Sequence, residues 1–175
     1  MLKTSTVLRT ATTSDLQQLS AIKSSVSRRT YGALMTEDQM AWWLDVGCSP
    51  SRFATPVDDP RSTVLIDDEA GAVGTVTCAE AAYISDVYVE RPGEGAGRRM
   101  VDALLAVGRE HGLAQAECSV MGWSPDAIAF WVRVGFTRGR FLTKPVFDPE
   151  GLMRRDGWMR SESFPTTYLG YVRPL

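Results

Sequence analysis

The chain has 175 residues, 44% hydrophobic and 23% charged, and its formal net charge is −2 at pH 7. This length suits a single domain with a sizeable core. The charge supplies no basic field for nucleic acid or for an anionic membrane, so we expect neither as a partner. No apolar run approaches the ~20 residues of a membrane span, and no secretory leader is recognisable. The three cysteines are scattered without metal-ligand spacing, so we expect a cytoplasmic protein without a metal.

The chain opens with a predicted strand and helix. Lys3–Ala11 is strand-like, and a helix starts directly after it, where Thr13 or Ser14 can cap and Asp15 adds negative charge to the first turn. The apolar face of this helix is marked by Leu16, Leu19, Ile22 and Val26.

A second helix is predicted to begin at Thr36, where Gln39 completes a capping box, and to run to Gly47. The next segment, Ser49–Arg61, carries three prolines and predicts a surface loop.

Three strands follow in the predicted order. Thr63–Ile66 and Ala72–Ala79 flank a polar DDEAG turn and predict a hairpin. Tyr83–Glu90 is rich in aromatic and β-branched residues, which favour a third strand.

A glycine-rich turn and a helix come next. Pro92 and Gly93 end the strand, and Gly95 and Gly97 leave the backbone without Cβ atoms. From Ala96 the apolar residues recur at helical spacing. A helix that starts at such a turn attracts phosphate, because free N–H groups and the positive end of the dipole point outward. The alternative is an ordinary tight turn whose glycines serve geometry alone.

The second half predicts another strand at Gln115–Val120 and a helix within Ser124–Phe136, with Ser124 as its N-cap. Two further strands are expected in Thr137–Phe147 and Thr167–Pro174. Strands followed by helices in this order indicate a mixed sheet with helices packed on it.

Two of these stretches resemble motifs of the GNAT family of N-acetyltransferases. The family's acyl-CoA-binding motif is a strand ending in Val, then Q/R-x-x-G-x-G/A, then a helix; Val89, Gly95 and Gly97 take the corresponding places. Its second motif, N-x-x-A-I-x-F-Y-x-x-x-G-F, is matched by Ala127, Ile128, Phe130, Gly135 and Phe136.

The resemblance implies an α/β (α+β) fold with a central mixed, mostly antiparallel sheet of roughly six to seven strands flanked by about four helices. It implies one domain over residues 1–175, in which residues 142–175 form an extended C-terminal segment. That segment is expected to pack either over the acceptor site or against a second subunit in a homodimer.

The resemblance also implies an activity. It is the transfer of an acetyl group from acetyl-CoA to a primary amine of a small molecule, by direct attack in a ternary complex. Acetyl-CoA would be held by Val87, Tyr88, Val89, Gly93, Glu94, Gly95, Ala96, Gly97, Arg98, Ser124, Ala127, Phe130 and Trp131.

Acetyl transfer needs a neutral amine, a donor for the oxyanion and a proton for the thiolate. Asp86, three residues before Val89, is the first choice for the group that accepts the amine proton, with Glu80 second and Glu117 third. An equally weighted alternative is that Asp86 is a structural acid bonded to neighbouring backbone.

The proton donor to the thiolate is open. Trp131 stands where the family has Tyr, and an indole N–H is a hydrogen-bond donor but no acid at neutral pH. Tyr88 or Tyr168 could serve instead, or the thiolate leaves without a dedicated acid. His111, the only histidine, suits a surface position at a helix C-terminus.

The first helical region forms one wall of the acceptor site in the resembled family. Tyr31, Trp42 and Trp43 could therefore bind the substrate together with Asp86 and Tyr168. The alternative is that the Trp pair anchors its helix to the core, which is the usual role of such aromatic residues.

Two other functions are kept open. Pro92, Glu94 and Trp131 depart from the family pattern and suit an inert acyl-CoA-binding sensor or scaffold. A protein or peptide N-acetyltransferase is the other alternative. A nucleotide-phosphate protein of another fold is less favoured, because neither a P-loop nor a dinucleotide fingerprint is present.

Overall fold

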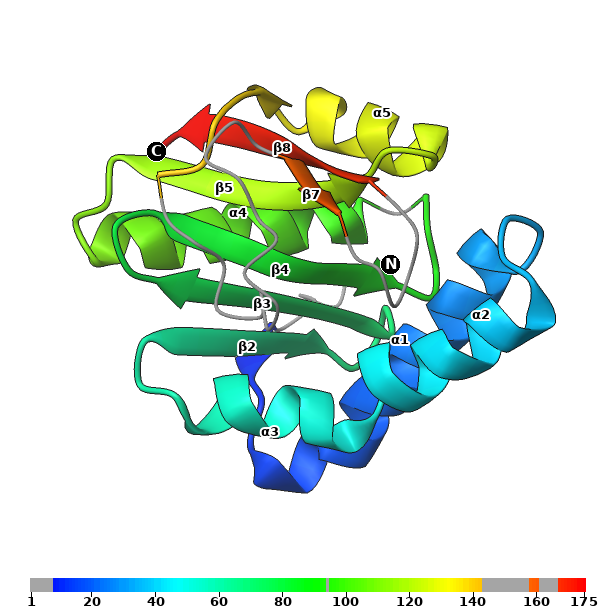
Figure 1. The fold of residues 1–175 in the computed structure, drawn as a ribbon. Coiled ribbons are helices and arrows are strands. Elements are labelled where there is room, and N and C mark those ends of the chain that lie inside the picture. The colour runs from blue at the N-terminus through cyan, green and yellow to red at the C-terminus, as the bar shows by residue number, and fades with distance from the viewer. Residues whose placement is uncertain (1–7, 94, 143–157, 161–166) are drawn as a thin grey trace, which may run out of the picture. The chain divides into compact units, whose positions relative to one another are not determined.

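The computed structural model describes residues 8–93, 95–142, 158–160 and 167–175 (Figure 1). The strands are β1 (Arg9–Thr10), β2 (Ser62–Asp67), β3 (Ala72–Cys78), β4 (Ala82–Val89), β5 (Gln115–Met121), β6 (Thr137–Arg138), β7 (Trp158–Arg160) and β8 (Thr167–Pro174). The helices are the 3-10 turn η1 (Thr13–Asp15), α1 (Leu16–Tyr31), α2 (Glu37–Trp42), the π-helical turn η2 (Trp43–Gly47), α3 (Pro50–Asp58), α4 (Ala96–Glu110) and α5 (Pro125–Arg133).

The strands join in one mixed sheet in the order β1-β2-β3-β4-β5-β8-β6, and β7 pairs with β8. The pairs β1–β2, β5–β8, β6–β8 and β7–β8 are antiparallel, whereas β4 and β5 run parallel and pair Ala82–Ile84 with Ala116–Cys118. The expected mixed, mostly antiparallel α/β fold is confirmed. The chain groups into two compact units that share β3 and β4: Met1–Thr75 with Asp86–Asp102, and Val76–Ser85 with Ala103–Leu175.

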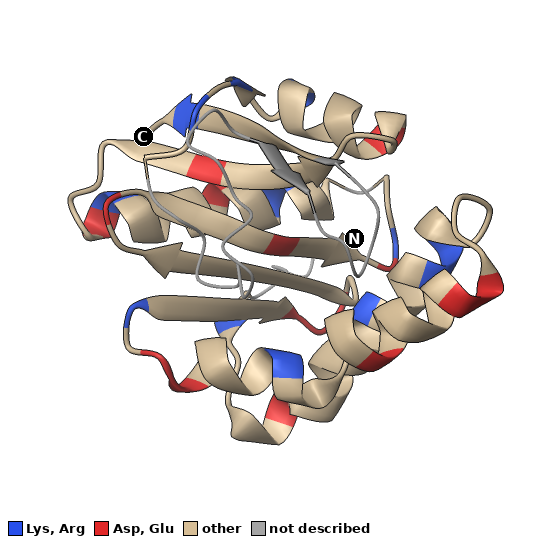
Figure 2. Ribbon diagram, viewed as in Figure 1, with Lys and Arg blue, Asp and Glu red and all other residues tan. Residues whose placement is uncertain are grey.

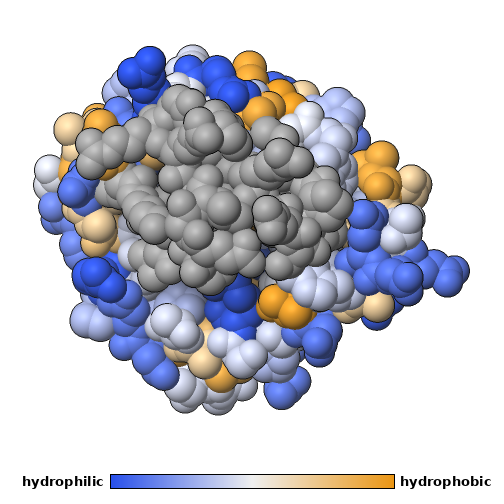
Figure 3. All heavy atoms as spheres, in the orientation of Figure 1, coloured by the Kyte–Doolittle hydropathy of each residue, from blue (hydrophilic) through white to orange (hydrophobic). Residues whose placement is uncertain are grey.

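Charged residues lie mostly on helices and turns, and the strands carry few (Figure 2). On the face shown in Figure 3, hydrophilic residues cover most of the described surface and hydrophobic ones form small, separate patches. Among the described helices, none is long and apolar enough to cross a membrane.

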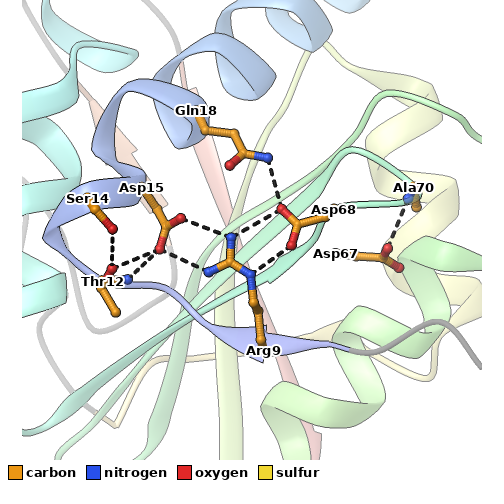
Figure 4. A network of polar contacts seen from close by, with 8 residues as sticks. All are labelled: Arg9, Thr12, Ser14, Asp15, Gln18, Asp67, Asp68 and Ala70. Atoms are coloured by element: carbon orange, nitrogen blue, oxygen red, sulfur yellow. Dashed lines mark hydrogen bonds and ion pairs between the residues drawn. The ribbon is translucent and has the colours of Figure 1, made fainter.

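In the first unit, β1 is held by an ionic network (Figure 4). The guanidinium of Arg9 in β1 bonds both Asp15, at 2.9 and 3.0 Å, and Asp68 in the β2–β3 turn, at 2.7 and 3.1 Å. Gln18 of α1 donates to Asp68 at 2.9 Å. The network therefore connects β1, the start of α1 and the β2–β3 turn.

The cap of this first helical segment differs from the prediction. Thr12, not Thr13 or Ser14, precedes the first helical turn, and its N–H donates to the Asp15 carboxylate at 2.8 Å. Asp15 thus caps the backbone through its side chain as well as adding charge. Of the strand predicted over Lys3–Ala11, only Arg9–Thr10 form β1 among the described residues, and residues before 8 lie outside them.

The predicted apolar face of α1 is confirmed, because Leu19, Ile22 and Val26 are buried. It packs into a core cluster with Phe53 of α3 and with strand residues from β2 and β3. The members of this cluster are Ala11, Leu19, Ile22, Phe53, Val64, Ile66 and Val73, with Leu16, Val57 and Tyr88 packed against it.

The surface loop predicted over Ser49–Arg61 is wrong, because most of it forms α3, which packs against α1 and β2. Pro50 stands at the first helical position, where its missing N–H costs nothing. Pro56 lies inside the helix, where proline is unfavourable. Phe53, 1% exposed, offsets that cost by burying its ring in the core.

The other predicted elements of the first half are confirmed. Thr36 caps α2, with Gln39 completing the capping box through bonds of 3.0 and 3.3 Å, and η2 continues the helical run to Gly47. β2 and β3 are neighbours in the sheet, as the hairpin prediction requires.

In the second unit, β5, α5 and β8 lie where the sequence predicts them. Ser124 occupies the N-cap position of α5, although its side chain makes no capping bond. The strand expected in Thr137–Phe147 is limited to β6 in the described residues, and β7 was not predicted. Residues 143–157 and 161–166 of the C-terminal extension lie outside the described residues.

Candidate active site

The loop between β4 and α4 adopts backbone conformations that require glycine. Gly93 has φ +106° and Gly95 has φ +75°, in the left-handed region that other residues rarely adopt. α4 starts at Ala96 and runs for 15 residues, so its first N–H groups and dipole face the loop. This is the strand–turn–helix arrangement that the sequence predicts for a phosphate site. Glu94, also predicted to contact the cofactor, lies outside the described residues.

Both ends of this loop are tied to neighbouring elements. Arg29 of α1 donates to the carbonyl oxygens of Val89, at 2.8 Å, and Glu90, at 2.7 Å. Arg99, in the first turn of α4, approaches the buried carboxylate of Asp67 to 3.8 Å. Arg29 and Arg99 were not among the predicted site residues, because each interacts with a residue far away along the chain.

Asp86 pairs with Lys23, which was also not among the predicted site residues. Lys23 of α1 donates to Asp86 Oδ1 at 2.6 Å, and the two side chains are 4% and 6% exposed. Lys23 lies four residues after Leu19 and one after Ile22, inside the apolar stripe of α1. A lysine within a core stripe is the signal that could have identified it.

Three aromatic rings surround the Lys23 ammonium. Nζ lies 5.1 Å from the ring centroid of Tyr88, 5.4 Å from that of Trp43 and 5.6 Å from that of Phe53. Each distance is within the range of a cation–π interaction. The carboxylate of Asp86 and the three rings therefore form an enclosure, called the ammonium cage below, that holds one cation.

Of the predicted substrate-binding residues, Trp43 is one of the three rings of the ammonium cage and Tyr31 lies beside it. Tyr31 packs edge-on against Trp43 with the ring centroids 6.4 Å apart, and the Trp43 indole donates to Ser27 at 3.0 Å. Burial raises the pKa of Tyr31 to about 12, against the smaller effect of its hydrogen bond with Tyr88. Tyr31 thus keeps its proton at neutral pH. Trp42, the third predicted residue, is half-buried in α2.

The other candidate carboxylates lie in the second unit. Glu80 is exposed in the turn after β3. Glu117 in β5 is fully buried and accepts from Gln115 Nε2 at 3.1 Å and from the Leu142 N–H. These backbone and side-chain donors meet the need of a buried carboxylate for hydrogen bonds.

Trp131 is part of an aromatic group in the second unit. It is 8% exposed and packs edge-on against Phe130, at 5.4 Å between centroids, and Phe136, at 5.0 Å. Ser124 is also buried, and Ala127 is half-buried on the same helix. Tyr168 is half-buried in β8, opposite Met121 and Met159.

Two residue types remain to be placed, the histidine and the three cysteines. His111 is exposed just beyond α4. Cys48, Cys78 and Cys118 are free and buried, which raises the pKa of each thiol. Within the described ranges, no group of three or more His, Cys, Asp or Glu residues is placed to hold a metal ion.

Comparison with known proteins agrees with this geometry. Residues 26–136 match the Acetyltransferase (GNAT) family. The PaiA N-acetyltransferase from Thermoplasma acidophilum, solved in complex with coenzyme A, is 12% identical with a TM-score of 0.73, covering 98% of this chain and 100% of that one. An acetyltransferase from Thermus thermophilus is 20% identical with a TM-score of 0.60 and 97% coverage of each chain.

A further similar structure is the ribosomal-protein-S18-alanine N-acetyltransferase from Escherichia coli, 16% identical with a TM-score of 0.58, covering 96% of this chain and 92% of that one. No curated protein matches the chain in sequence. The family match spans more than half of the chain, and the fold agrees with it. The chain therefore belongs to the acetyltransferase (GNAT) family and has the fold of an acyl-CoA-dependent N-acetyltransferase.

Proposed function

We propose that the protein transfers an acetyl group from acetyl-CoA to a primary amine of a small molecule, by direct attack in a ternary complex. The observation that carries this proposal is the Asp86 carboxylate, which binds the ammonium nitrogen of Lys23 at 2.6 Å in the ammonium cage. Asp86 and Tyr88 of the cage lie on β4, whose end leads directly into the glycine loop and α4. The carboxylate of Asp86 thus lies on the strand that leads into the loop suited to phosphate.

Each proposed role follows from this arrangement. N–H groups at Gly95, Ala96 and Gly97 would bind the pyrophosphate, and the Val89 N–H would donate to the thioester oxygen. The neutral amine attacks the carbonyl carbon, a C–N bond forms, and the C–S bond breaks. Asp86 accepts the proton that the nitrogen loses, and CoA leaves as a thiolate. Tyr88, one of the three rings of the cage, is the proposed proton donor to that thiolate.

A second candidate function is CoA binding without turnover. Trp131 supports it, because the indole that replaces the family's tyrosine is packed between Phe130 and Phe136 and offers no acidic proton. The two candidates differ in whether CoA is released in the presence of an amine.

The test has two stages. Calorimetric titration with acetyl-CoA and CoA should show binding of both, while ATP and NAD should not bind. Thiol release over a panel of amines should then require both an amine and acetyl-CoA. Asp86→Asn should lower kcat by about a hundredfold, the scale of general acid–base catalysis. The matched Asp102→Asn, at an exposed position of α4, should keep full activity.

The outcomes separate the candidates. Binding of both CoA species without amine-dependent thiol release supports the non-catalytic function. Absence of CoA binding refutes both. Full activity of Asp86→Asn refutes the role of Asp86 while leaving the transferase function in place.

A further inference from the structure

The Lys23–Asp86 pair cancels the charge that would attract a protonated amine. The pair is almost fully buried, with an N–O distance of 2.6 Å, and it is neutral as a whole. A lone buried carboxylate would favour an ammonium ligand strongly. Here that preference is already satisfied by a residue of the chain itself.

The helix that carries Lys23 contacts β4 at a second place. Six residues further along α1, Arg29 donates hydrogen bonds to the carbonyl oxygens of Val89 and Glu90. Six helical residues advance about 9 Å, and the three to four strand residues from Asp86 to Val89 or Glu90 advance about 10–13 Å. Because the two rises match, α1 runs along the end of β4 with a cation at each contact. The Arg29 contacts thus help to hold the backbone of α1, and with it the Lys23 backbone, beside β4.

The electrostatic consequence for a ligand is large. A second ammonium bound to Asp86 would lie about 6 Å from Lys23 Nζ, and at an effective dielectric constant of about 20 their repulsion weakens binding by about a hundredfold. The three rings of the ammonium cage add no compensation, because they already face the Lys23 ammonium. A neutral amine escapes this penalty.

A buried hydroxyl on the same sheet face suits a neutral amine as well. Thr75 in β3 is 1% exposed, and its Oγ1 has no hydrogen-bond partner within the part of the chain that the structure describes. Side chains two apart on a strand share a face, so Thr75 shares one with Val73 and Asp86 shares one with Tyr88. Val73 and Tyr88 pack in the same core cluster, so all four face it. A neutral amine can both donate to and accept from such a hydroxyl, whereas an ammonium can only donate.

We propose that the acceptor is an amine that is neutral near pH 7, such as an arylamine or a hydrazide, and that Lys23 is the residue that selects it. The inference rests on the proposed transferase function and adds the chemical class of its acceptor. Asp86 then receives the proton from the nitrogen as the C–N bond forms, and it does not have to deprotonate an ammonium first.

The test compares aniline with benzylamine, which have similar shapes but differ in charge at pH 7. The measured quantity is the ratio of kcat/KM for benzylamine to that for aniline, in wild type, Lys23→Met and Lys23→Arg. Intrinsic reactivity cancels, because the ratio is compared between enzymes. Lys23→Met should raise the ratio by 10- to 100-fold, on the order of the removed repulsion. Lys23→Arg keeps the charge and should leave the ratio within about threefold.

Wild type provides a test that does not depend on a variant folding. For benzylamines whose ring substituents change the amine pKa, kcat/KM should rise with pH until it levels at the pKa of each amine. A break at one pH for every amine would overturn the inference, as would an unchanged ratio in a folded Lys23→Met enzyme. If no amine, including aniline and benzylamine, causes release of the CoA thiol from acetyl-CoA, the proposed function is overturned and the inference with it.

Discussion

Removing the charge of Lys23 should destabilise the protein more than most single substitutions. Lys23→Met keeps an unbranched side chain of similar length in the apolar stripe of α1 but removes the ammonium from the buried Asp86 carboxylate. Breaking a buried ion pair from one side costs about 3–5 kcal/mol. The side chains of the pair are 4% and 6% exposed, so solvent can compensate little of that cost.

The matching double variant separates the ion pair from its surroundings. Lys23→Met combined with Asp86→Val replaces both charges by apolar groups, and such replacements are often neutral or stabilising by about 1–4 kcal/mol. The double variant should therefore be more stable than Lys23→Met alone. Arg28→Met changes an exposed cation on the same helix and should alter stability by no more than about 0.5 kcal/mol.

Urea denaturation followed by tryptophan fluorescence measures these differences. A loss of about 3 kcal/mol lowers the midpoint by roughly 1–2 M urea, and it lowers Tm by about 6–12 °C for a chain of this length. The reasoning is refuted if Lys23→Met loses less than about 1 kcal/mol, or if the double variant is as unstable as the sum of its two single variants.

Three further predictions concern the ties around the site. Arg29→Ala removes both bonds to the β4 carbonyls and should weaken CoA binding several-fold in calorimetry at unchanged Tm, whereas Arg28→Ala should not; equal affinities would exclude Arg29 from loop positioning. Gly95→Ala should cost about 1 kcal/mol because φ is +75°, whereas Gly97→Ala, inside α4, should cost nothing. Asp15→Asn should lose about 1 kcal/mol at pH 7, because hydrogen bonds from Arg9 and then from the capped Thr12 N–H hold the pKa of Asp15 far below its usual range. That contribution is present above pH ~4 and is lost as the pH falls below it, so wild-type and variant stabilities should converge in acid; a constant difference would contradict the assignment.

The prolines of α3 show why a prediction from local sequence alone was wrong for this segment. Three prolines within Ser49–Arg61 are a valid signal for a loop, since each removes a donor and restricts its neighbour. In the folded chain, Phe53 buries its ring between α1 and the sheet, and this packing outweighs the local cost of Pro56. No property of the segment by itself carries that information.

The sequence by itself determined most of the elements and their order, α3 and β7 excepted, and it determined the strand, glycine-rich turn and helix that form β4 and α4. Hydrophobic period, glycine position and capping residues act within a few positions of one another, so they can be read without the fold. The motifs that depend on such local patterns also sufficed to predict the family.

Only the tertiary structure decided what surrounds Asp86. Lys23 lies 63 positions away in the sequence, and Trp43 and Phe53 come from two further helical segments. A carboxylate in a strand is compatible with an exposed base, a backbone partner or a buried ion pair, and its neighbours choose among these. The packing of α1 along β4 brings an ammonium to 2.6 Å from Asp86, because burying either charge alone would cost more than burying them together.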